Sequence, residues 1–254
     1  MKSLLSVLLC LVLSSTVLAA PIYEAVILKK LPHSRSDYTQ GLEIRAGKLY
    51  QSTGQYGKSK LRVFNLADGK LLHSQRLPRQ LFGEGITLLN DKLVQLTWRA
   101  GIARVYQLPK LQLIEEFSLP GQGWGLTNDG KHLIYSDGSD QLHFLTADSW
   151  RQLHSIKVHD QGQPVRHLNE LEWTPDYILA NIWLTDWILM IDPVTGEVIG
   201  RIDLHNLLPA DQRRSDTGVL NGIARDPDTG ELWVTGKNWP WLYQIELRAK
   251  NRLE

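Results

Sequence analysis

A short phrase recurs five times in this chain: a polar or aromatic residue, then Gly or Glu, then an aliphatic residue, followed by a turn and a second strand-like run. The copies begin 44, 40, 45 and 52 residues apart. A repeat of about 40–45 residues made of short strands is typical of a β-propeller, with one four-stranded blade per repeat. The repeat therefore predicts an all-β, five-bladed β-propeller. Its copies are Gln40-Gly41-Leu42, Glu84-Gly85-Ile86, Trp124-Gly125-Leu126, Asn169-Glu170-Leu171 and Asn221-Gly222-Ile223.

Three further strands are predicted in most repeats, separated by turns rich in Gly, Asn and Asp. Second strands are expected to start at Lys48, Lys92, His132, Tyr177 and Glu231. Third strands are expected at Leu61–Leu66, Ala103–Leu108, Leu142–Thr146, Ile188–Asp192 and Leu242–Leu247. Fourth strands are expected at Leu71–Leu77, Leu113–Leu119, Leu153–Val158 and Val198–Leu204.

The last repeat ends before it can form a fourth strand. Tyr23–Leu31, which precedes the first repeat, has strand character. Pairing of this segment beside Tyr243–Leu247 would complete the last blade, close the ring and leave no long edge exposed. The polar segment His205–Gly218 lengthens the last repeat and is predicted to be a loop over one face.

The N-terminus resembles a secretion signal. Lys2 is followed by an almost entirely apolar run from Leu4 to Leu13, and Val17-Leu18-Ala19 offers a small-residue cleavage pattern. Residues 1–19 are thus predicted to be a signal peptide, and residues 20–254 a single catalytic propeller domain of about 235 residues. We expect a periplasmic or secreted protein that has no membrane segment after cleavage.

Composition and motifs exclude several classes of function. Lys and Arg number 28 against 27 Asp and Glu, so no basic excess favours nucleic acid as a partner. Cys10 is the only cysteine and lies in the predicted signal, which leaves no thiolate for a disulfide or a metal. The eight histidines show no metal-ligand spacing. We therefore expect that catalysis needs no metal.

At two sets of equivalent positions, the residue type differs from one repeat to the next. Because the first strand of each blade lies nearest the axis, the five residues that open the repeats should surround the channel. A second equivalent set follows the second strands. Together they supply a carboxylate, three amides, three tryptophans and a lysine, the mixture expected of a ligand pocket. The first set is Gln40, Glu84, Trp124, Asn169 and Asn221, and the second is Gly54, Trp98, Gly138, Trp183 and Lys237.

Each of these residues also has a purely structural interpretation. Glu84 could be a solvated or salt-bridged channel carboxylate, and Lys237 a surface charge. The amides could bond the backbone, and the tryptophans could pack between blades. A functional site is favoured because these residues occupy equivalent positions in the repeats and should therefore lie close together.

Around these positions the chain resembles the plant and bacterial glutaminyl-peptide cyclotransferases, which are five-bladed propellers. The resemblance spans almost the whole chain after the predicted signal, and its segments come in the family's order. They are Tyr38-Thr39-Gln40-Gly41-Leu42, Phe82-Gly83-Glu84-Gly85-Ile86-Thr87, Leu96-Thr97-Trp98, Gly123-Trp124-Gly125-Leu126-Thr127, Leu168-Asn169-Glu170-Leu171-Glu172, Ala180-Asn181-Ile182-Trp183, Val219-Leu220-Asn221-Gly222-Ile223-Ala224 and Thr235-Gly236-Lys237-Asn238-Trp239-Pro240.

The resemblance implies conversion of the N-terminal glutamine of peptides to pyroglutamate with loss of ammonia, without a cofactor. It implies that Glu84 transfers the proton and that Gln40, Asn169 and Lys237 are the other polar site residues. It also implies an aromatic, substrate-binding wall. A monomer is expected. The residues of that wall are Tyr38, Phe82, Trp98, Trp124 and Trp183.

Two rival functions remain open at the level of sequence. A non-catalytic propeller could bind peptides or sugars at a tryptophan-rich mouth, because fold alone does not define function. A metal-dependent propeller lactonase would need several axial carboxylates, whereas Glu84 is the one carboxylate among the inner set. The coexistence of Glu84 and Lys237 with the tryptophans favours the cyclotransferase.

Overall fold

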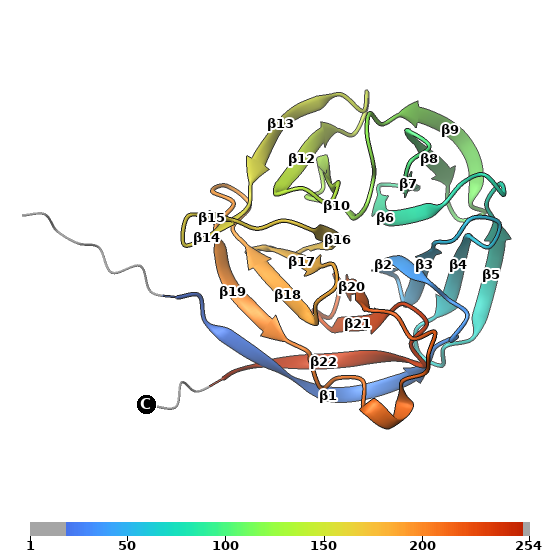
Figure 1. The fold of residues 1–254 in the computed structure, drawn as a ribbon. Helices are drawn as coiled ribbons and strands as arrows, with labels where there is room; N and C mark the ends of the chain where they lie inside the picture. Colours follow the sequence, from blue (N-terminus) through green and yellow to red (C-terminus); the bar gives the residue numbers. More distant parts are fainter. Residues whose placement is uncertain (1–18, 251–254) are drawn as a thin grey trace, which may run out of the picture.

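The structure is a computed structural model that describes residues 19–250. The predicted signal segment therefore lies outside the described residues, apart from Ala19. Within this range the chain consists of β-strands and one 3-10 turn, η1 (Ala210–Gln212). The sheets are arranged around a central axis in a propeller-like manner (Figure 1). No helix of residues 19–250 is long and apolar enough to cross a membrane.

Three four-stranded antiparallel sheets follow one another along the first part of the chain. All their strands begin within two residues of the predicted positions, so the repeat located them correctly. The first sheet is β2 (Thr39–Arg45), β3 (Lys48–Thr53), β4 (Lys60–Asn65) and β5 (Leu71–Arg76). The second is β6 (Gly83–Leu89), β7 (Lys92–Thr97), β8 (Ile102–Gln107) and β9 (Gln112–Ser118). The third is β10 (Leu126–Asn128), β11 (His132–Ser136), β12 (Gln141–Thr146) and β13 (Gln152–Lys157).

The remaining long strands form one eight-stranded sheet in the order β16-β17-β18-β19-β1-β22-β21-β20. Its first half is β16 (Leu168–Trp173), β17 (Ile178–Ile182), β18 (Trp187–Ile191) and β19 (Val198–Asp203). Its second half is β1 (Ile22–Pro32), β22 (Trp241–Ala249), β21 (Leu232–Gly236) and β20 (Leu220–Arg225). A short hairpin that the repeat did not predict, β14 (His159–Asp160) and β15 (Gln163–Pro164), precedes β16.

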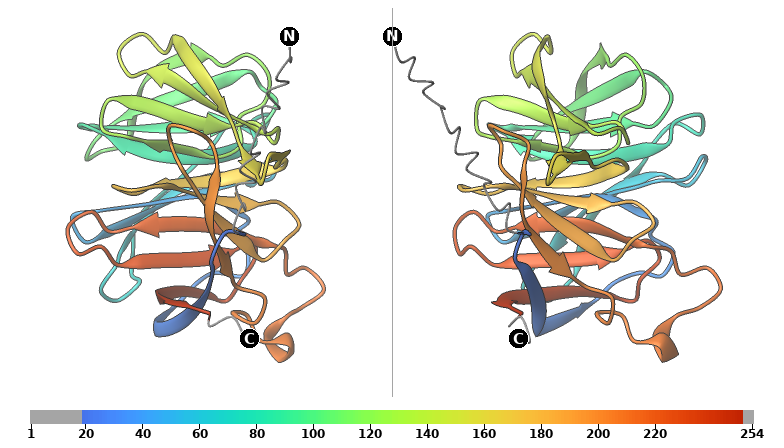
Figure 2. Two further views of the ribbon diagram at one scale, coloured as in Figure 1. Left: turned by 90° about the vertical axis from the view of Figure 1, so that its left-hand side faces the viewer. Right: turned by 60° about the vertical axis from the view of Figure 1, so that its left-hand side comes forward.

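The N-terminal strand β1 joins the two halves of this sheet. It runs antiparallel to β22 from Tyr23 opposite Ala249 to Pro32 opposite Trp241, so the predicted pairing of these two segments is observed. It also pairs in parallel with the end of β19, where Ile22 lies opposite Arg201. This second pairing was not predicted, and it joins two groups of four strands into one continuous sheet. Figure 2 shows β1 and β22 from the side.

The first strands of the repeats surround the axis. Contacts run from β2 to β6, from β6 to β10, from β10 to β16, from β16 to β20 and from β20 back to β2. This close approach explains the glycine of the repeated phrase. A Cβ at Gly85 would lie 2.5 Å from the backbone nitrogen of Leu126 in the neighbouring sheet.

The hydrophobic core lies between successive sheets. In one cluster, Leu96 and Val105 of the second sheet pack with Leu126 and Leu133 of the third, and all four are almost fully buried. The predicted loop at residues 205–218 adds to the core as well, because Leu207 and Leu208 are buried against the last sheet. The loop therefore anchors itself through apolar contacts as well as passing over one face.

Candidate active site

A cavity of about 390 Å³ opens at one end of the axis, where the first strands begin and the second strands end. All nine residues predicted to form the site line this cavity. Antiparallel pairing brings the two sets of site residues together. The start of each first strand lies beside the end of the second strand that follows it. In the second sheet, for example, Gly83 pairs opposite Thr97. The lining residues are Tyr38, Gln40, Phe82, Glu84, Trp98, Arg99, Gln122, Trp124, Asn169, Trp183 and Lys237.

Glu84 lies at the base of this cavity, with only 3% of its surface exposed. Its Oε2 accepts a 2.6 Å hydrogen bond from Nε2 of Gln40 on the adjacent strand. Burial raises the pKa of the Glu84 carboxyl well above its usual range, although the Lys237 charge and the Gln40 bond lower it. A carboxyl group whose pKa is raised by burial holds its proton more firmly than a solvated one, a shift often found in general acid–base catalysts.

Gln40 is itself held in place by a third inner residue. Nδ2 of Asn221 donates to the backbone carbonyl of Thr39 at 3.0 Å and to Oε1 of Gln40 at 3.4 Å. The Gln40 oxygen is thereby turned toward Asn221 and its nitrogen toward Glu84. Asn221 is absent from the cavity lining, so it supports the site through Gln40.

Lys237 is 3% exposed and makes no hydrogen bond or ion pair through its side chain within residues 19–250. Burial lowers the pKa of the ammonium to about 8, against an opposing influence of Glu84. Its Nζ lies 5.0 Å from the centre of the Tyr38 ring, a cation–π contact. The ammonium therefore has hydrogen-bond donors available for a ligand.

Asn169 supplies an acceptor without a partner. Its Oδ1 is buried and makes no hydrogen bond within the described chain, although the side chain lines the cavity. Buried polar atoms in folded proteins are nearly always paired, and an orphan atom commonly marks a functional position. A ligand that donates an N–H group would satisfy it.

Aromatic rings form the walls. The centroids of Phe82 and Trp98 are 5.4 Å apart, and Trp124 meets Trp183 edge-on at 5.7 Å. Tyr38 lies edge-on to Phe82 at 6.2 Å. Such walls bury an aliphatic side chain and exclude water from the polar groups below them.

The two glycines of the second equivalent set make room for these rings. A Cβ at Gly54 would lie 2.2 Å from the Phe82 ring, and one at Gly138 would lie 2.7 Å from the Trp124 ring. The glycines thus belong to the site by leaving space, a role that their residue type alone did not reveal.

Three side chains of the site were missed from the sequence. Oε1 of Gln122 accepts hydrogen bonds from the indole Nε1 of Trp98 at 2.6 Å and of Trp124 at 3.2 Å, so one amide fixes two walls. The guanidinium of Arg99 stacks 3.9 Å from the Trp98 ring centre. Tyr56, which is half exposed, touches Phe82 at the rim. These residues lie in connections outside the repeated phrase, and the sequence gave no signal for them because the site was located from the repeated positions alone.

Glu170, the obvious rival carboxylate, has a different environment. It is fully buried, but its two oxygens accept hydrogen bonds from the backbone amides of Leu42 at 3.1 Å and Ile223 at 2.8 Å. It does not line the cavity. Glu170 therefore replaces the usual glycine of the repeat in order to link inner strands across the axis.

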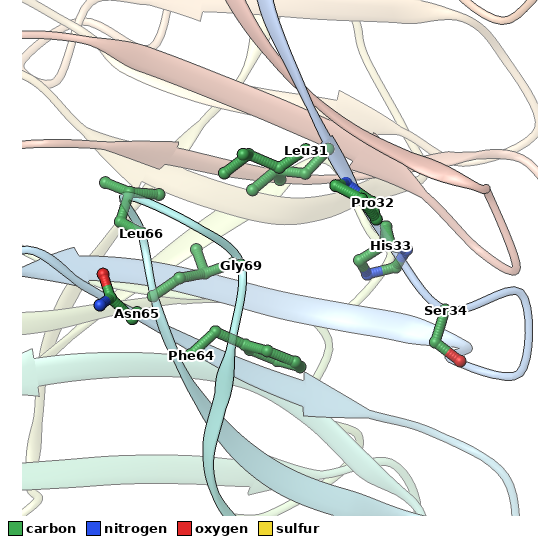
Figure 3. A pocket seen from close by; sticks show the side chains of 10 residues that line it. Leu31, Pro32, His33, Ser34, Phe64, Asn65, Leu66 and Gly69 are labelled. Carbon is green, nitrogen blue, oxygen red and sulfur yellow. The ribbon is translucent and has the colours of Figure 1, made fainter.

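The hollow beside β1 is too small for a peptide. A hollow of about 30 Å³ between β1 and the β4–β5 turn is lined by Leu31, Phe64 and Leu66 and has room for about one water molecule (Figure 3). No three His, Cys, Asp or Glu side chains of residues 19–250 are grouped as metal ligands.

Comparisons with known proteins agree with this geometry. A family model described as glutamine cyclotransferase matches residues 3–247. A glutaminyl-peptide cyclotransferase of Arabidopsis thaliana is 39% identical over 242 residues, covering 92% of this chain and 75% of the relative. The crystal structure of Myxococcus xanthus glutaminyl cyclase has a TM-score of 0.85 and 33% identity, covering 91% of this chain and 100% of that chain. The chain belongs to the glutamine cyclotransferase family.

Proposed function

We propose that this protein converts the N-terminal glutamine of peptides and proteins to pyroglutamate and releases ammonia, with Glu84 as the proton carrier. The observation that carries the proposal is the buried Glu84 carboxyl, which shares an aromatic cavity with the unpaired Lys237 ammonium and the unpartnered Asn169 oxygen. Family membership supports the activity, and this arrangement is what supports the proposed roles of the residues.

The reaction closes a five-membered ring within the substrate. The neutral α-amine attacks the γ-amide carbon, a C–N bond forms and the carbonyl electrons move onto oxygen. The ionised Glu84 carboxylate takes one proton from the attacking nitrogen and delivers it to the amide nitrogen. The oxyanion then collapses, the bond to that nitrogen breaks and ammonia leaves. Folding the side chain back in a narrow cavity removes most of the entropy cost of closure.

The remaining polar groups fit the charges that develop. Lys237 has free donors and can stabilise the oxyanion. The Oδ1 of Asn169 can accept a hydrogen bond from the substrate amide nitrogen and so orient the leaving group. Gln40, held by Asn221, keeps the Glu84 carboxyl pointing into the cavity.

The ionisation states require intermediate pH. Glu84 and the substrate amine must lose their protons, whereas Lys237 must keep its own. Because burial lowers the pKa of Lys237 to about 8, turnover should fall above that pH. A bell-shaped dependence of kcat on pH is expected.

The decisive assay mixes the purified protein with Gln-Ala amide and follows ammonia and pyroglutamyl product together. N-acetyl-Gln-Ala amide is the matched control, because its blocked nitrogen cannot attack. We expect ammonia from the free peptide alone. Ammonia from both peptides would indicate hydrolysis of the side-chain amide, and ammonia from neither would refute the proposal.

We further propose a five-bladed ring that β1 closes, with residues 20–254 as one catalytic domain. The β1–β22 pairing and the closed circuit of inner strands support this count. We also propose that residues 1–19 direct export to the periplasm or the medium, and that the mature protein is a monomer. N-terminal sequencing of the secreted protein and its sedimentation would test these statements.

A further inference from the structure

A second cavity, of about 630 Å³, opens beside the first sheet. We call it the basic groove, because its walls carry Arg35, Lys58, Lys60 and Arg76 against the single carboxylate of Asp216. None of these five side chains takes part in an ion pair within residues 19–250. The groove therefore presents an uncompensated positive charge.

The neighbouring charges do not neutralise it. Asp37 is already engaged, since Arg62 binds its carboxylate at 2.5 Å. Burial lowers the pKa of Lys60, and the charges of Arg62 and Arg76 lower it further, against an opposing influence of Asp37. Nη1 of Arg35 is buried without a hydrogen-bond partner in the described chain, although Nη2 donates to a backbone carbonyl. The mutually repelling cations that line the groove favour an anionic occupant.

The groove lies near the catalytic cavity, because two chain segments contribute residues to both linings. Asn238 lines the groove and follows Lys237 of the cavity, and its backbone nitrogen donates to the carbonyl of Asp37. Ser36 lines the groove two residues before Tyr38. At about 3.8 Å between successive Cα atoms, Ser36 lies within about 8 Å of the cavity wall.

A substrate that leaves the cavity on this side meets the groove after a few residues. An extended peptide advances about 3.3 Å per residue, so its third to fifth residues lie about 7–13 Å beyond the N-terminal glutamine. We propose that the basic groove binds acidic side chains at about the third to fifth positions of the substrate and makes the enzyme selective for such peptides. This inference rests on the proposed cyclisation and specifies its substrate class.

The test compares three peptides with amidated C-termini: Gln-Ala-Glu-Glu-Ala, Gln-Ala-Lys-Lys-Ala and Gln-Ala-Ala-Ala-Ala. Amidation removes the terminal carboxylate, and a fourth, unamidated all-alanine peptide measures its effect separately. Exposed ion pairs are individually weak, so two or three of them should give the acidic peptide about a tenfold higher kcat/KM than the basic one. The difference should lie in KM, because remote contacts bind ground and transition states alike. It should shrink as salt is added.

Charge-reversal variants test whether the side chains of the basic groove cause the preference for acidic peptides. The double variant Lys58→Glu, Arg76→Glu changes two exposed side chains of the groove, and we expect it to reverse the order of the acidic and basic peptides. The matched control is Lys110→Glu, Arg151→Glu, two exposed cations in the β8–β9 and β12–β13 connections, which makes the same change in net charge. It should keep the wild-type order.

Equal kcat/KM for acidic and basic peptides at low salt would overturn the groove assignment, as would a reversal in the control variant. A preference for the unamidated over the amidated all-alanine peptide, with no preference for Glu, would overturn it in favour of terminal carboxylate binding. Quenching of tryptophan fluorescence by the same peptides measures peptide binding independently of ammonia release. Selective binding of the acidic peptide without ammonia release would uphold the groove and refute the cyclisation.

Discussion

Replacement of Glu84 by Gln tests the central chemical claim. The amide has nearly the shape of the carboxyl group, and its oxygen can still accept the hydrogen bond from Gln40. It cannot accept and return a proton. General acid–base catalysis contributes about 10²–10⁴-fold to turnover, so kcat for Gln-Ala amide should fall by roughly that factor. KM should change little, because the aromatic walls remain.

Thermal stability gives an independent readout for the same variant. Burial raises the folded-state pKa of Glu84 well above that of the unfolded chain. A raised pKa means that stability is complete below the unfolded value and is lost as pH rises through the folded value. The uncharged side chain of Glu84→Gln does not suffer this loss of stability. The difference in Tm between the variant and the wild type should therefore be more favourable to the variant at pH 8 than at pH 5.

Glu170→Gln is the matched control. Glu170 accepts from two backbone amides, and a glutamine would turn its NH₂ group toward one of them. An unsatisfied buried donor costs about 1–3 kcal/mol, so this variant should melt earlier but keep its turnover per folded molecule. If Glu170→Gln abolishes turnover while Glu84→Gln stays near wild type, the assignment of the proton carrier is refuted.

Four more outcomes are expected. Gln122→Leu removes the acceptor of two indole N–H groups and should raise KM several-fold, with unchanged far-ultraviolet circular dichroism as the check on folding. Lys237→Arg should shift the alkaline limb of kcat, near pH 8 in the wild type, to higher pH, because arginine stays charged; an unmoved limb would contradict the role of the ammonium. Gly54→Ala should displace the Phe82 ring and lower kcat/KM, since the new Cβ would lie 2.2 Å from it; a wild-type value would show that the ring relocates freely. Deletion of Ile22–Pro32 should expose the edge of β22 and cause aggregation, and a soluble product with unchanged Tm would count against closure by β1.

Much of the architecture and of the site could be predicted from the sequence. Strand positions followed from turns and alternating apolar residues, which act over a few residues only. Equivalent places in the repeat also placed Glu84, Asn169 and Lys237 around one axis, and all three line the cavity. A sequence repeat shows which residues occupy equivalent positions in successive sheets. Equivalent positions near the axis bring their side chains to the same cavity.

Other features depended on contacts between distant segments. The parallel pairing of β1 with β19 has no local signature, because any strand with a free edge could have accepted it. Gln122 lies in the irregular connection between β9 and β10, and its hydrogen bonds to two tryptophans exist only after two sheets pack together. The sequence separated Glu84 from Glu170 by their places in the repeat and by the family resemblance, but it gave no view of their surroundings. Their residue type is the same, and only the tertiary structure gives one of them two backbone donors and leaves the other facing a cavity, because burial and partners, not identity, decide what a carboxyl group does.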